Sequence, residues 1–94
     1  MSIYTAKITA APSTNLDSEY AKGSVDANIY RDGVLTDMEV TLVTDPVSGF
    51  LDTWGSPYNW CSDPDLLNQW AAEAGQDRWA FSGEIVVAVR AANR

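Results

Sequence analysis

The stretch that decides the fold is SVDANIYRDGVLTDMEVT, residues 24–41. The dipeptide Asp32-Gly33 near its centre is typical of a two-residue type I′ turn, because both turn positions need positive φ angles. Apolar and polar residues alternate on each side of this dipeptide, which is the period of a half-buried strand. The stretch therefore predicts a β-hairpin that runs from Ser24 to Thr41.

A two-residue turn also fixes which residues of the hairpin face each other. It places Arg31 opposite Val34 and, in the same register, Ala27 opposite Met38. The predicted core face carries Val25, Ala27, Ile29, Met38 and Val40. The predicted solvent face carries three carboxylates, Asp26, Asp37 and Glu39, with Asp26 directly opposite Glu39. Opposed like charges destabilise a sheet, so these acids indicate either a solvated face or a surface that binds a partner.

Shorter strands are predicted on both sides of the hairpin. Residues Ile3 to Ala10 alternate in the same way and predict a first strand. The polar residues Ala11 to Glu19 predict a loop. Residues Phe50 to Trp54 follow a turn at Asp45-Pro46 and Ser48-Gly49, and they can form a further short strand.

The residues after Ser62 carry helix start and stop signals. Asp63 is a good N-cap and Pro64 suits the first helical position. The apolar residues that follow recur at helical spacing, and they are Leu67, Trp70, Ala71 and Ala74. Gly75 supplies the C-terminal stop, so a short helix is expected between Asp63 and Gly75.

The last segment, Arg78 to Arg90, is expected to form a long strand that bends at Gly83. The predicted fold is α+β: an antiparallel sheet of about four to five strands with one short α-helix packed on one face, in a single domain of residues 1–94. The residues expected to be buried where helix and last strand meet are Trp70, Trp79, Phe81, Ile85 and Val87.

Composition excludes much of the chemistry of small enzymes. The 94 residues contain no histidine and one cysteine, Cys61, so a disulfide within the chain, a Cys/His zinc site and an imidazole base are excluded. The acids Asp45, Asp52, Asp63 and Asp65 do not follow the calcium-loop pattern. We therefore expect no catalytic residues, no metal and no cofactor. The first residues lack signal-peptide order and no apolar run could span a membrane, so a cytoplasmic, membrane-free protein is expected.

Charge is distributed unevenly along the chain. The 46 residues between Arg31 and Arg78 contain nine carboxylates and no Lys or Arg, and the whole chain has a net charge of −7. An acidic chain is attracted to basic partners. Direct binding to a phosphate backbone is disfavoured for the same reason.

Aromatic residues gather in a segment rich in Gly, Ser, Pro and Asn. Phe50, Trp54, Tyr58 and Trp60 fall within eleven positions. Trp and Tyr are common anchors of protein interfaces, and they also stack on sugars, in which case Asn59 and Asp52 could bond hydroxyl groups. A third interpretation is a lid in which the rings are buried over the sheet.

In size, acidity and lack of catalytic residue types the chain resembles the small acidic anti-CRISPR and anti-restriction proteins of phages. This resemblance implies a non-catalytic inhibitor, active in the host cell cytoplasm, that docks on the basic nucleic-acid channel of a host complex. The residues expected to contact the partner are Asp26, Asp37, Glu39, Asp45, Asp52, Trp54, Tyr58, Trp60, Asp63 and Asp65. The alternatives are a carbohydrate- or small-ligand-binding module, and a phage structural or assembly protein that pairs, as in a homodimer, through an open sheet edge.

Overall fold

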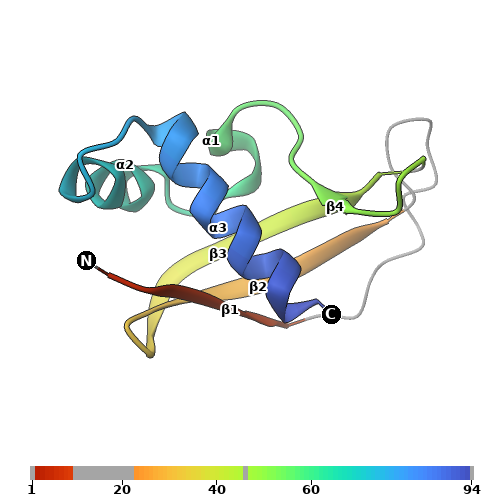
Figure 1. Ribbon diagram of the computed structural model, residues 1–94, viewed down its shortest axis with the longest axis horizontal. Helices are drawn as coiled ribbons and strands as arrows, with labels where there is room; N and C mark the ends of the chain where they lie inside the picture. Colours follow the sequence, from red (N-terminus) through yellow and green to blue (C-terminus); the bar gives the residue numbers. More distant parts are fainter. Residues whose placement is uncertain (1, 10–22, 46, 94) are drawn as a thin grey trace.

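A four-stranded antiparallel sheet forms one layer of the computed structural model, which describes residues 2–9, 23–45 and 47–93 (Figure 1). Its strands are β1 (Tyr4–Ile8), β2 (Ser24–Arg31), β3 (Val34–Thr44) and β4 (Leu51–Asp52), which lie in the sheet in that order. Three helices follow: α1 (Pro57–Trp60), α2 (Pro64–Glu73) and α3 (Arg78–Ala92). The α+β class and the antiparallel sheet are thus confirmed.

The hairpin turns at Asp32-Gly33, as the sequence predicts. Asp32 has a φ of 51° and Gly33 a φ of 81°, the left-handed conformation that a type I′ turn requires. Arg31 faces Val34 and Tyr30 faces Leu35, so the predicted register holds next to the turn.

Further from the turn the predicted register is wrong by two residues. Ala27 faces Val40 in place of Met38, because residues 36–38 of β3 bulge opposite Ile29. The Thr36 hydroxyl accommodates the bulge: it donates to the Ile29 carbonyl at 2.6 Å and accepts from the Met38 amide at 3.2 Å. A shift of two residues keeps every side chain on its predicted face.

The shift also removes the opposed like charges. Asp26 faces Thr41, not Glu39, and the Thr41 hydroxyl donates to the Asp26 carboxylate at 2.7 Å. A hydrogen bond therefore replaces the repulsion that the predicted register implied.

The two shorter strands, β1 and β4, agree in part with the strands predicted from the sequence. β1 pairs with β2, with Ala6 opposite Ile29. The predicted short strand after Phe50 is present as the two residues of β4, which pair with Val43 and Thr44. The predicted loop from Ala11 to Glu19, like the end of the first strand at Ala10, lies outside the described residues.

Helix α2 is confirmed. Asp63 caps it by accepting a hydrogen bond from the Leu66 amide at 3.1 Å, and Pro64 occupies the first helical position. Gly75 has a φ of 68° just beyond the helix, a conformation that glycine adopts without strain.

The predicted strand from Arg78 to Arg90 is wrong, because these residues form helix α3. Asp77 caps it by accepting from the amides of Trp79 and Ala80 at 2.9 and 3.0 Å. Apolar residues occur at both odd and even positions here, so alternation does not separate a strand from a buried helix. The buried positions of α3 recur every three to four residues, and they are Phe81, Ser82, Ile85, Val86, Ala88 and Val89.

The core lies between the sheet and the helices, on the side of the sheet that α3 crosses (Figure 1). Trp70, Phe81 and Ile85 are buried there as expected. Trp79 and Val87 are 58% and 62% exposed, so their predicted burial is wrong. Odd positions share one face of a strand, but in a helix residues 79 and 87 lie on the side away from residues 81 and 85.

Candidate functional site

The opposite face of the sheet has no buried side chain among the described residues. We call it the open face. Its residues alternate along each strand with the core residues. They are Thr5 and Lys7 of β1; Ser24, Asp26, Asn28 and Tyr30 of β2; Leu35, Asp37, Glu39, Thr41 and Val43 of β3; and Asp52 of β4.

The open face is acidic. Asp26, Asp37, Glu39 and Asp52 lie on it, and Lys7 is the one basic residue of its four strands that shares this side. Asn28 separates Lys7 from Glu39 across the sheet. Among the described residues the one ion pair joins Arg31 to Glu73, so Lys7 is not paired with Glu39. The face is therefore predominantly negative.

A small pocket of about 250 Å³ lies beside the open face, at the edge of β3. We call it the edge pocket. β4 pairs with β3 at Val43 and Thr44, and the chain then leaves the sheet. It returns to β3 at residues 61 and 62, where the Ser62 amide donates to the Glu39 carbonyl and Val40 bridges to Cys61. The pocket lies between these contacts and is lined by Glu39, Thr41, Trp54, Asn59, Trp60, Cys61 and Ser62.

Glycine at position 55 shapes one wall of this pocket. Gly55 has a φ of 68°, and a Cβ atom added there would lie 2.1 Å from the Asn59 side-chain nitrogen. The absence of a side chain thus lets the Asn59 amide fold back against the loop. Trp54, one residue earlier, is 47% exposed.

The predicted aromatic anchors separate into three environments. Trp54 lies at the rim of the open face and lines the same pocket as Glu39 and Thr41. Tyr58 points elsewhere: its hydroxyl bonds Asn68 and Arg78, and the Arg78 guanidinium lies 4.8 Å from the centre of its ring. Trp60 is 3% exposed and belongs to the core. The prediction that three exposed rings form a platform for a sugar is therefore wrong. Trp60 is buried, as the lid interpretation expects.

Three predicted acidic residues, Asp45, Asp63 and Asp65, lie outside the strands that form the open face. Asp45 accepts hydrogen bonds from the amides of Val47 and Ser48 at 2.8 Å each, and these bonds lower the pKa of its carboxyl. Asp63 caps α2 and Asp65 lies in its first turn, where a negative charge is favourable. Local structure accounts for all three.

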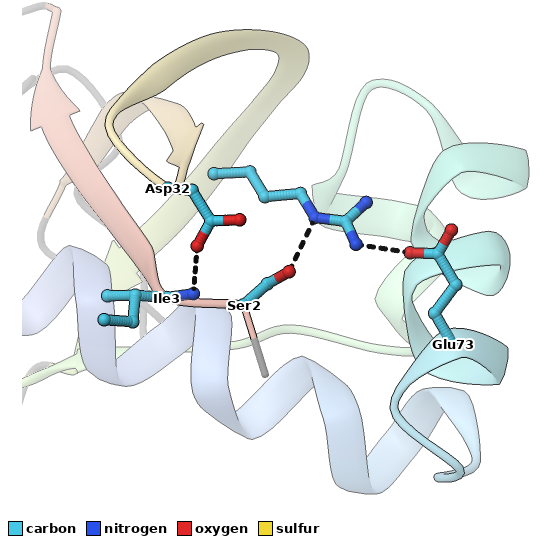
Figure 2. A network of polar contacts seen from close by, with 5 residues as sticks. Ser2, Ile3, Asp32 and Glu73 are labelled. Atoms are coloured by element: carbon cyan, nitrogen blue, oxygen red, sulfur yellow. Dashed lines mark hydrogen bonds and ion pairs between the residues drawn. The ribbon is translucent and has the colours of Figure 1, made fainter.

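A second polar cluster ties the hairpin turn to the chain start and to α2 (Figure 2). Arg31 forms an ion pair with Glu73 and also donates to the Ser2 hydroxyl at 3.1 Å. The Ile3 amide donates to Asp32 at 2.8 Å, and this bond lowers the pKa of the Asp32 carboxyl. A pocket of about 350 Å³ adjoins the cluster. Because Arg31 is already paired, we assign this cluster a structural role.

Sequence reasoning missed three residues of the edge pocket: Thr41, Cys61 and Ser62. Thr41 lies in the predicted hairpin, yet its place beside Trp54 depends on the return of the chain at residues 61–62. Ser62 accepts from the Glu39 amide at 2.8 Å through its hydroxyl. No local sequence signal marks either contact, since both join residues far apart in the chain.

Comparison of the chain with protein-family models, with curated proteins and with solved structures gives no match. Within residues 2–9, 23–45 and 47–93, no group of three acidic or cysteine side chains is arranged to hold a metal ion. Over the same residues, no helix has the length and apolar character needed to cross a membrane.

Proposed function

We propose that this protein is a non-catalytic inhibitor that docks its open face on a basic, nucleic-acid-binding surface of another protein. The target class we favour is a bacterial defence complex, such as a CRISPR effector or a restriction enzyme, whose DNA channel is lined with Lys and Arg. One observation carries the proposal: a sheet face with no buried side chain among the described residues holds four carboxylates, and the exposed residue Trp54 lies at its rim.

Charge supports this assignment more than it supports any other partner. The net charge of −7 repels nucleic acid and anionic membrane surfaces. It attracts a basic groove over long distances, which raises the association rate. Asp37 and Glu39 are exposed, lie two residues apart on β3 and can meet neighbouring basic side chains.

The size of the open face indicates that docking also involves its rim. Three strand spacings of about 4.8 Å and eight residues of about 3.3 Å give the sheet face a projected area of roughly 400 Å². A stable interface covers about 800 Å² on each partner. The footprint must therefore extend past the strands, and Trp54 at the β3 edge is a suitable anchor because Trp is frequent among hot-spot residues.

The test is displacement of DNA from a panel of purified CRISPR effector complexes and restriction enzymes, measured by gel shift. We expect the wild-type protein to release DNA from at least one of them. The double variant Asp37→Lys and Glu39→Lys should lose this effect by at least about 100-fold, since close interfacial charge pairs can couple by several kcal/mol. Asp26 is left unchanged because its carboxylate bonds Thr41.

A matched control separates position from net charge. The double variant Asp65→Lys and Glu84→Lys changes the charge equally but on the helices, where both residues are exposed. It should still release DNA. The proposal is overturned if no complex in the panel releases DNA, or if the open-face variant and the control variant act alike. Circular dichroism checks that each variant folds.

A further inference from the structure

The edge pocket combines a carboxylate, an exposed indole ring and neutral hydrogen-bonding groups. Glu39 contributes the charge and Trp54 the ring, while Thr41, Asn59 and Ser62 contribute hydroxyl and amide groups. An anion would be repelled by Glu39, and a purely apolar group would cover the Glu39 carboxylate without giving it a partner. The chemistry of the lining therefore selects a cation.

The same chain pairs arginine with aromatic rings at two other places. The Arg78 guanidinium lies 4.8 Å from the ring centre of Tyr58, and that of Arg31 lies 5.9 Å from the ring centre of Tyr4. Trp is the strongest cation–π partner of the aromatic residues. Among the described residues, however, no arginine or lysine is stacked on Trp54. This ring and the neighbouring carboxylate are free to receive a cation from outside.

Arginine fits this combination better than lysine. Its planar guanidinium can stack on an indole face while its N–H groups bond a carboxylate side by side. It is also more weakly hydrated than an ammonium group, so it enters a partly enclosed site at lower cost. A pocket of about 250 Å³ has room for the end of one such side chain.

We infer that the edge pocket receives one arginine side chain of the partner, held between the Glu39 carboxylate and the Trp54 ring. This inference rests on the proposed function, because the pocket adjoins the open face that meets the partner. An arginine bound in this pocket adds a directional contact to the long-range charge attraction between the open face and the partner. The basic surface of the target should accordingly present an arginine at the border of the contact.

The pocket can be tested without knowing the target. The probes are N-acetyl-arginine amide, the corresponding lysine and citrulline compounds, and hexa-arginine, titrated into ¹⁵N-labelled protein. We expect saturable shifts of the Trp54 indole N–H signal and of the Thr41 and Ser62 amide signals. Arginine should bind at least about threefold more tightly than lysine. Citrulline, which has the same shape without the charge, should cause no saturable shift.

Variants identify the groups responsible. Glu39→Gln and Trp54→Leu should each weaken arginine binding at least about threefold. Glu84→Gln removes the same charge on α3, beside the separate pocket that Arg31 and Glu73 line, and should leave binding unchanged. Equal binding of arginine and citrulline, or equal loss in Glu39→Gln and Glu84→Gln, would overturn the inference.

The two proposals can fail separately. If arginine does not bind but the Lys substitutions at positions 37 and 39 abolish DNA displacement, the pocket inference is wrong and the proposed function stands. If arginine binds at Trp54 but no defence complex releases DNA, the pocket inference stands and the proposed target class is wrong.

Discussion

Two residues at the hairpin turn hold the first strand and a helix in place. Asp32 occupies a turn position with positive φ and at the same time accepts the Ile3 amide (Figure 2). Arg31, beside it, forms the ion pair with Glu73 of α2. One turn therefore fixes the position of the first strand and of a helix that is distant in sequence.

The Asp32 contact makes stability depend on pH. Its folded-state pKa is lowered, so the contact contributes fully above the unfolded value of about 3.9 and is lost as the pH falls through the folded pKa. We expect the free energy of unfolding, measured by urea titration between pH 5 and pH 2.5, to fall more steeply in the wild type than in Asp32→Asn. Asn tolerates the turn conformation and does not titrate. The control Asp65→Asn removes a charge without removing this bond, and a slope like that of Asp32→Asn in the control would contradict the prediction.

Among the elements, α3 differs most from the expectation based on sequence. Its residues are apolar at both odd and even positions, so the pattern suits a covered strand as well as a helix. The cap at Asp77 and the abundance of alanine favour the helix. The helix exposes Trp79 and Val87 and buries Phe81, Ile85 and Val89.

Two glycines provide a matched test of these elements. Gly83 lies inside α3, and an added Cβ would meet nothing within 4 Å. Gly83→Ala should therefore stabilise the protein by about 0.5–1 kcal/mol, because glycine is a poor helix former. Gly55→Ala should instead destabilise it, since its φ is 68° and the methyl group would overlap Asn59. Chemical unfolding measures both, and destabilisation by Gly83→Ala would argue for the bent strand and against the helix.

Local signals account for the parts of the fold that the sequence could predict. The turn at Asp32-Gly33 and the cap at Asp63-Pro64 depend on neighbouring residues, and both are present. Alternation could not predict the bulge at residues 36–38. It depends on the Thr36 hydroxyl, which bonds the Ile29 carbonyl where the regular backbone ladder is interrupted. The assignment of side chains to the two faces of the sheet is still correct, because a shift of two residues leaves each side chain on the same face.

In the candidate site, too, local patterns could be predicted and contacts between distant residues could not. The acids Asp37 and Glu39 could be placed on one face from alternation alone. The meeting of Trp54 with Glu39 could not, because it depends on the return of Ser62 to β3, a contact across 23 residues. The exposure of Trp79 was missed for a different reason, since it followed from the wrong period for residues 78–90.

At the scale of the whole molecule, the net charge should oppose folding and favour association. Like charges on the open face repel each other in the free protein, and the screening length falls from about 30 Å at 0.01 M salt to about 8 Å at 0.15 M. We expect the melting temperature to rise over this range while DNA displacement from the target weakens. Calorimetry and the gel-shift assay measure the two responses. Parallel changes would contradict an electrostatic mode of docking.

The bulge in β3 has a consequence for shape. A bulged antiparallel strand bends and twists more than a regular one, and the helices lie on one side of the sheet (Figure 1). Bulges also re-aim side chains, and Asp37 lies within this one while Glu39 directly follows it. The spacing and direction of the two carboxylates are therefore set by the bulge and not by the repeat of a regular strand.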